Sequence, residues 1–154
     1  MNWVLIKAVC ITRKRGLLHL RPADKPLNFV CLTSKCALCC RLVGSPVVSQ
    51  IEAQKIDPSH ILKNKYGMFI KSKDCTCSVL AGNLCSIYPD RPRGCREYPW
   101  YNIDGRLYYD AGCPGITING DNRPDVSEIE PFENFFPRTL KFIICVIKKI
   151  CLKK

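Results

Sequence analysis

The sequence lacks any long run of apolar residues. Its longest is FIICVI at residues 142–147, whereas a helix that crosses a membrane needs about 18 or more. It also lacks the pattern of a secretory signal peptide, because Lys7 interrupts the first apolar stretch and further charges follow it. We therefore expect a cytoplasmic protein.

Residues that usually perform catalysis are scarce. The only histidines are His19 and His60, and no Ser/His/Asp or Cys/His grouping is visible. The sequence also has no glycine-rich turn between a strand and a helix that would bind a nucleotide or a methyl donor. We expect both histidines to be exposed side chains rather than metal ligands, and the sequence leaves open whether the protein is an enzyme.

Acidic residues are scarce at both ends of the chain. Residues 1–30 hold six Lys/Arg and one Asp, and residues 138–154 hold six Lys/Arg and no acid. The formal net charge of +11 therefore lies in two basic flanks, because residues 31–137 hold twelve of each sign. We expect these flanks to balance an acidic metal-loaded core; contact with nucleic acid or an anionic membrane is the less favoured alternative.

Cysteine, in contrast, is abundant, at 12 of 154 residues. A chain of this length can bury a hydrophobic core without disulfides, and in a reducing compartment many thiols indicate metal binding or catalysis. A disulfide scaffold is the alternative. Cys10, Cys145 and Cys151 lie in apolar surroundings and are expected to be buried as small hydrophobic residues.

Several cysteines have the spacing of metal ligands. Two residues separate Cys36 from Cys39, which lets two thiolates reach one tetrahedral centre from a single turn. Cys40 follows directly, and in an extended segment its side chain would leave on the opposite face, toward another centre or another iron of a cluster. Together with Cys31, the spacing matches the plant-type [2Fe–2S] order, although a three-cysteine match can arise by chance.

The segment CSIYPDRPRGCREYPW, at residues 85–100, combines two cysteines with three prolines. Each proline removes a backbone donor and disfavours the helical conformation of the residue before it. We therefore predict a stiff loop with no helix through it, locked at its cysteines. Arg91, Arg93 and Arg96 bracket Cys95, and we expect them to lower the pKa of its thiol and to donate hydrogen bonds to sulfur.

Three stretches resemble one protein family when they are taken together. They are FVCLTSKCALCCR, CSVLAGNLCSIYPDRPRGCREYP and GCPGI. The chain resembles the zinc- or iron-chelating domain of the YkgJ-type cysteine-cluster proteins over roughly residues 29 to 116. Related domains occur in larger proteins that methylate flagellin lysines, so the resemblance implies metal binding and allows an accessory role in an enzyme.

Carried over position by position, the resemblance implies eight metal ligands. They are Cys31, Cys36, Cys39, Cys40, Cys77, Cys85, Cys95 and Cys113. The sequence departs from the family pattern in two places: four residues fill the first gap, and Ala37 stands where glycine is usual. Cys75 is therefore an alternative to Cys31. Arg91 and Arg96 are the expected hydrogen-bonding neighbours of the ligand sulfurs.

We predict an α+β fold, a small cysteine-rich domain with a few short helices and β-hairpins around one or two metal centres. A basic extension with a hairpin occupies residues 1–30, the cysteine-cluster domain residues 31–117, and an acidic loop with a basic helix residues 118–154. The capping-box pattern from Ser49 to Glu52 predicts a helix to about residue 56, and Asp57-Pro58 a second helix that ends at Gly67. Asp104-Gly105 predicts a tight hairpin turn.

The predicted cofactor is an iron–sulfur cluster or zinc, with the cluster slightly favoured. In that case the protein has a redox role with a protein redox partner, or it is a component of an enzyme. The rival is a zinc-stapled binding module that contacts nucleic acid, membrane or protein through its basic ends.

Overall fold

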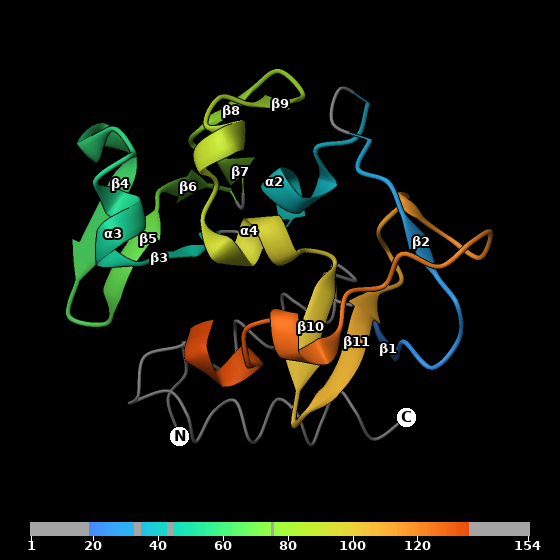
Figure 1. Cartoon of the computed structure of the whole chain (residues 1–154). Coiled ribbons are helices and arrows are strands. Elements are labelled where there is room, and N and C mark those ends of the chain that lie inside the picture. Colours follow the sequence, from blue (N-terminus) through green and yellow to red (C-terminus); the bar gives the residue numbers. More distant parts are fainter. Residues whose placement is uncertain (1–18, 33–34, 43–44, 75, 136–154) are drawn as a thin grey trace.

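The computed structural model describes residues 19–32, 35–42, 45–74 and 76–135. Within these ranges the elements are short helices and antiparallel strand pairs, which confirms the predicted α+β class (Figure 1). The expected N-terminal hairpin and C-terminal helix lie outside the described residues, as do Cys10, Cys75, Cys145 and Cys151. None of the helices in the described part is long and apolar enough to span a membrane.

One sheet has the strand order β1-β11-β10. Its strands are β1 (Leu20–Pro22), β10 (Trp100–Ile103) and β11 (Arg106–Asp110). The β10–β11 hairpin was predicted, and its two turn residues have the required positive φ angles, 52° at Asp104 and 76° at Gly105. A further ladder beside this sheet pairs β2 (Asn28–Phe29) with β12 (Ile116–Thr117).

A second group of strands is built from the middle of the chain. The order β3-β5-β4 joins β3 (Val47–Val48), β5 (Gly67–Ile70) and β4 (Ile61–Asn64). Two small hairpins follow. They are β6 (Ser72–Lys73) with β7 (Thr76–Cys77), and β8 (Leu80–Ala81) with β9 (Leu84–Cys85).

The described helices are all short. They are α2 (Leu38–Leu42), α3 (Gln50–Ala53), α4 (Arg93–Glu97) and 3-10 turns at Pro58–His60, Tyr88–Asp90, Val126–Glu128 and Phe132–Phe135. The capping box at the start of α3 is confirmed, because Ser49 Oγ accepts the N–H of Glu52 and the Glu52 carboxylate accepts the N–H of Ser49.

Two predictions about helices are wrong. The helix expected from Asp57 to Gly67 is a single 3-10 turn, because the chain continues from Ile61 as β4 and Gly67 begins β5 instead of ending a helix. The segment at residues 85–100 contains two short helices. Its prolines permit them because Pro92 is the N-cap of α4 and Pro89 lies in the first turn, where no backbone donor is needed.

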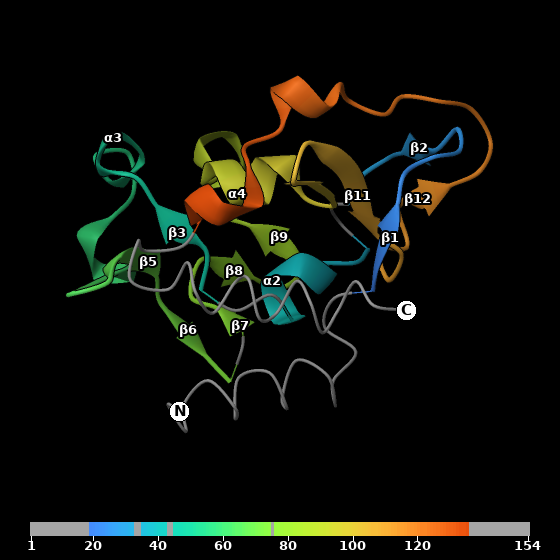
Figure 2. The same cartoon turned by 90° about the horizontal axis from the view of Figure 1, so that it is seen from below.

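Two hydrophobic cores flank α4. The first contains Val48, Ile56, Ile70, Cys77 and Val79, and the second contains Ala23, Leu27, Trp100 and Ile129. In both views α4 lies between the β3–β5 strands and the β10–β11 hairpin (Figures 1 and 2). Pro92 and Pro99, at the two ends of α4, are fully buried and so anchor it between the cores.

Candidate metal centre

A cavity of about 110 Å³ is lined by residues from several described segments between Phe29 and Gly115. All eight cysteines expected to be ligands line it: Cys31, Cys36, Cys39, Cys40, Cys77, Cys85, Cys95 and Cys113. These residues span more than half of the chain, and all eight are free thiols. The other lining residues are mostly apolar, and Arg91 and Arg96 also reach the wall.

Cys39 and Cys40 approach the cavity from α2. Their Sγ atoms lie 4.0 Å apart, so the expectation that neighbouring side chains point to opposite faces is wrong here. That expectation assumed an extended chain, whereas α2 is helical and directs both thiols to one cavity. Ala37, just before α2, has a φ of 53°, a conformation that glycine adopts with no steric penalty. Glycine would therefore suit this position better than alanine does.

Cys31, Cys36 and Cys113 lie around the β2–β12 ladder. The ladder continues past the strands through a hydrogen bond from Val30 N–H to the Gly115 carbonyl at 3.0 Å, which brings the segments of Cys31 and Cys113 together. A Cβ atom at Gly115 would lie 2.4 Å from the Val30 carbonyl oxygen, so this close approach requires glycine. Cys36 Sγ accepts the backbone N–H of Leu38 at 3.4 Å.

Cys77 and Cys85 come from the two small hairpins. Cys77, at the end of β7, is buried in the first core. Cys85, at the end of β9, packs against the same core, as does Cys40. The local β pairing therefore fixes these thiols on the side of the cavity formed by the middle of the chain.

The thiol of Cys40 interacts by hydrogen bonding with those of Cys39 and Cys85, which shifts the pKa values of all three. A hydrogen bond from Cys40 lowers the pKa of Cys85 to about 6, and the backbone N–H of Ile87 and the charge of Arg91 act in the same direction against burial. The Cys40 hydrogen bond likewise lowers the pKa of Cys39 to about 7. The pKa of Cys40 is raised because hydrogen bonding with Cys39 and Cys85, together with burial, favours its protonated form. Two thiolates are therefore formed readily at neutral pH, which is the state that binds metal.

Cys95 behaves differently from the expectation. Burial, followed by the charges of neighbouring cysteines, raises the pKa of its thiol to about 12, and Arg91 only partly opposes this. The predicted lowering of this pKa is therefore wrong: Arg91 acts in the predicted direction, but burial outweighs its charge. Arg93 points away from the thiol, because its guanidinium pairs with Glu97 and, at 2.5 Å, with Glu130.

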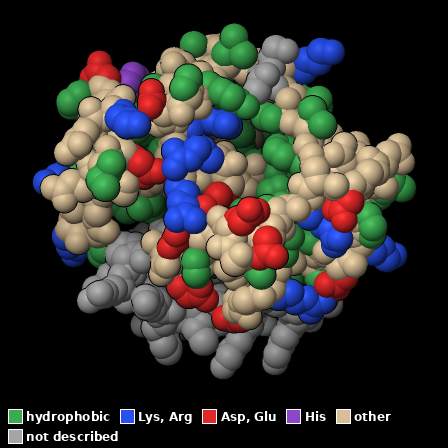
Figure 3. Space-filling model, viewed as in Figure 1, with side chains coloured by type: hydrophobic (Ala, Val, Ile, Leu, Met, Phe, Trp, Pro, Cys, Tyr) green, Lys and Arg blue, Asp and Glu red, His purple; other side chains and the backbone are tan. Residues whose placement is uncertain are grey.

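Arg91 and Arg96 are the cations among the described residues that line the cavity. The Arg91 guanidinium lies 3.6 Å from the centre of the Tyr88 ring, and its Nε donates to the Tyr88 carbonyl at 2.9 Å. Arg96 donates to the Arg91 carbonyl and lies 3.5 Å from Glu52. Figure 3 shows basic side chains gathered over α4, next to acidic ones. Both arginines line the cavity, so their charge is placed to offset that of thiolates.

The histidines lie away from the cavity wall. His60 Nδ1 is 3.0 Å from Ser78 Oγ, and the backbone N–H of His19 donates to Asp110. The sequence analysis missed the contact between Tyr98 and Asp110, which lies near the thiols. Tyr98 lines the cavity, and its hydroxyl donates to the buried Asp110 carboxylate. No local sequence signal marks this pair, because the contact depends on the turn between α4 and β10.

The donor set suits a soft metal. Sulfur is the only ligand type that lines the cavity in quantity, and thiolates select zinc, copper(I) and iron–sulfur clusters. Among the described residues no three His, Cys, Asp or Glu side chains form a closed ligand set as they stand. The thiols thus share one cavity without surrounding a single point.

The family model CxxCxxCC, described as "Putative zinc- or iron-chelating domain", matches residues 30–114. The chain belongs to this family. The matched range covers more than half of the chain and includes all eight cysteines that line the cavity. No curated protein and no solved structure matches the chain. The CxxCxxCC family relates the cavity to metal chelation and does not specify the metal.

Proposed function

We propose that the protein binds a polynuclear metal centre, with an iron–sulfur cluster favoured over zinc. The ligands we propose are Cys31, Cys36, Cys39, Cys40, Cys77, Cys85, Cys95 and Cys113. The single observation that carries the proposal is that eight thiols line one cavity of about 110 Å³. Four thiolates around one zinc ion, at about 2.3 Å each, enclose no space beyond the ion itself. A cavity of this volume, with spare thiols, fits several metals and bridging sulfide better.

The surroundings of the thiols support a redox role. Mostly apolar residues line the cavity, and Arg91 and Arg96 place positive charge at its wall. Charge, hydrogen bonds and solvent access are the properties by which proteins set the potential of such a centre. The protein would then act with a protein redox partner, or as an accessory component of an enzyme, in the cytoplasm.

Anaerobic purification tests the proposal directly. The expected result is a brown protein that contains iron and acid-labile sulfide and whose visible absorption bleaches on reduction. The control is a Cys77→Ser/Cys85→Ser variant, which should lose the absorption because both thiols line the cavity. Stoichiometric zinc without iron would overturn the cluster, and the absence of both metal and sulfide would overturn metal binding itself.

A zinc-stapled binding module is the second candidate, favoured by the two basic flanks. Here residues 31–117 would be the metal-stapled domain, and residues 1–30 and 118–154 would contact nucleic acid, an anionic membrane or a protein. Such contacts weaken steeply as salt concentration rises. The module predicts a colourless zinc protein whose binding is lost at high salt, and removal of the basic residues at 138–154 should abolish that binding.

A further inference from the structure

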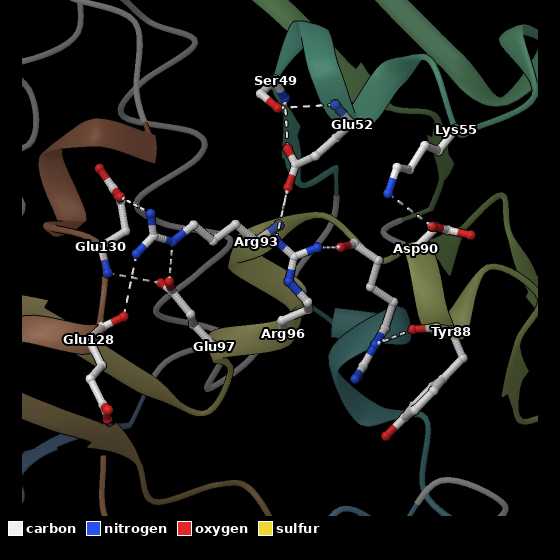
Figure 4. Close-up of polar contacts among 11 residues, drawn as sticks. Ser49, Glu52, Lys55, Tyr88, Asp90, Arg93, Arg96, Glu97, Glu128 and Glu130 are labelled. Atoms are coloured by element: carbon white, nitrogen blue, oxygen red, sulfur yellow. Dashed lines mark hydrogen bonds and ion pairs between the residues drawn. The ribbon is translucent and has the colours of Figure 1, made fainter. Parts of the chain in front are cut away.

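The Glu52 carboxylate connects two segments that lie far apart in the sequence. One oxygen, Oε2, accepts the backbone N–H of Ser49 at 2.9 Å and completes the capping box of α3. The other, Oε1, accepts the backbone N–H of Arg93 at 2.6 Å (Figure 4). A capping-box glutamate ordinarily serves only its own helix, so the second contact requires another explanation.

The second contact satisfies the first N–H group of α4. The N-cap residue of α4 is Pro92, whose side chain makes no capping hydrogen bond. The first N–H groups of a helix have no partner within the helix, and here the carboxylate from α3 supplies one. Arg96 of α4 also reaches Glu52, with Nη2 at 3.5 Å from Oε1. A carboxylate at this end of a helix is also favoured by the helix dipole.

The location of α4 gives this contact its importance. Cys95 is the central residue of α4. Arg96 is also part of this helix, and Arg91 lies two residues before its start. All three line the thiol cavity. A small rotation of α4 would therefore displace one sulfur and two cations together.

We propose that Glu52 is a positioning residue of the metal centre, which holds α4 in the orientation that directs Cys95 and Arg96 to the cavity. The proposal rests on the ligand role of Cys95 in the proposed function. The Glu52 side chain is only 17% exposed, so few water molecules compete for its carboxylate oxygens. The ligand orientation thus depends on a residue that itself does not contact the metal.

The chain contains a matched control. Asp125 and Glu128 form a second capping box, in which the Glu128 carboxylate accepts the N–H of Asp125 at 3.1 Å and reaches no backbone N–H of α4 in the described structure. A glutamine has one acceptor oxygen, so Glu128→Gln can keep its single hydrogen bond. Glu52→Gln cannot serve both Ser49 and Arg93, because its amide group would face one of the two N–H donors.

Anaerobic titration of the metal-free full chain with cobalt(II) tests the role, with the sulfur-to-cobalt absorption as the readout. Glu52→Gln should weaken binding by roughly 10- to 100-fold, the usual effect of losing a residue that orients a ligand. It should also change the shape of the absorption band, which loss of stability alone would not do. Glu128→Gln should bind as the wild type does. Equal affinities and spectra for Glu52→Gln and the wild type would overturn the proposal.

Cys95→Ser separates the positioning role from the ligand role. If Glu52 acts through α4, Glu52→Gln should weaken binding by less than roughly twofold in a Cys95→Ser background. A full effect in that background would overturn the positioning role. Wild-type affinity in Cys95→Ser would instead show that the ligand assignment is wrong, whatever Glu52 does.

Hydrogen exchange of the wild type needs no variant and covers the case in which Glu52→Gln fails to fold. On addition of cobalt(II), peptides that contain residues 49–53 and 93–97 should gain protection together, because the Glu52 carboxylate joins them. Protection of residues 93–97 alone would overturn the coupling, and the segment at 125–128 serves as the internal control.

Discussion

The Tyr98 hydroxyl lies 3.2 Å from Oδ2 of Asp110, a carboxylate that is 5% exposed. The other oxygen, Oδ1, accepts the N–H of Gly112 at 2.9 Å and that of His19 at 3.2 Å. One buried acid therefore joins Tyr98 at the end of α4, the backbone of His19 and the turn that leads to Cys113. Burial raises the pKa of the Cys113 thiol, although a backbone hydrogen bond from Gly115 acts to lower it.

Replacement of Tyr98 by phenylalanine tests this arrangement. Tyr98→Phe leaves one oxygen of a buried carboxylate without its donor, and we expect a loss of about 1–3 kcal/mol in the free energy of unfolding. Chemical denaturation of the metal-free protein measures it. The control is Tyr66→Phe, at a ring that is exposed to solvent. Equal stabilities for the two variants would show that the hydroxyl contributes nothing.

The Gly115 position gives a second prediction. Gly115→Ala places a methyl group 2.4 Å from the Val30 carbonyl oxygen, so the ladder that brings Cys31 and Cys113 together must shift. We expect a loss of about 1–3 kcal/mol, typical of overpacking, together with weaker metal binding. Gly82→Ala is the control because its Cβ meets no atom within 4 Å, although its positive φ adds a smaller strain. A Gly115→Ala variant with wild-type metal affinity would contradict the role of the ladder.

The thiols should differ in reactivity when no metal is bound. The lowered pKa values of Cys85, about 6, and Cys39, about 7, make them thiolates at pH 7.5, whereas Cys95, with a pKa raised to about 12, stays protonated. Brief treatment with iodoacetamide should therefore modify Cys85 and Cys39 well before Cys95. Peptide mass spectrometry gives the order. Faster modification of Cys95 would contradict the assigned environments, and metal-loaded protein should be protected at all three.

Stability of the metal-free protein should fall at acid pH through Glu52. Burial alone would raise the pKa of this carboxyl, but hydrogen bonds from Ser49 and Arg93 and the charge of Arg96 outweigh burial and lower it below 4.5. A group with a lowered pKa in the folded state stabilises the fold above the pKa of the unfolded state, and this stabilisation is lost as the pH falls. Urea denaturation between pH 7 and pH 3 should show a shallower loss in Glu52→Gln. An identical pH dependence in the variant would contradict the prediction.

The elements that were predicted correctly from the sequence depend on residues that are close to one another along the chain. The Asp104-Gly105 turn and the Ser49–Glu52 capping box are local, because each is determined by backbone conformation and hydrogen bonds within a few residues. The set of cysteines around the cavity was predicted from the family pattern, which carries long-range information that a single local window does not contain.

The features that were missed depend on tertiary contacts. Local capping signals predicted a helix where Ile61–Asn64 forms β4, because they do not indicate that this segment pairs with β5. The contact of Glu52 with Arg93 joins residues 41 positions apart. The high pKa of Cys95 likewise results from burial by the folded chain, which outweighs the nearby positive charges. Each of these three features depends on residues that become neighbours only in the folded chain.

The thiol cavity has walls from both halves of the protein. Ile70, Cys77 and Val79 belong to the first core, and Phe29, which packs on the second core, also lines the cavity. Ligation across this boundary would fasten two separately packed bodies to each other. Loss of the metal should then loosen their mutual orientation before it melts either one, and small-angle scattering would detect this as a swollen molecule that keeps its circular dichroism.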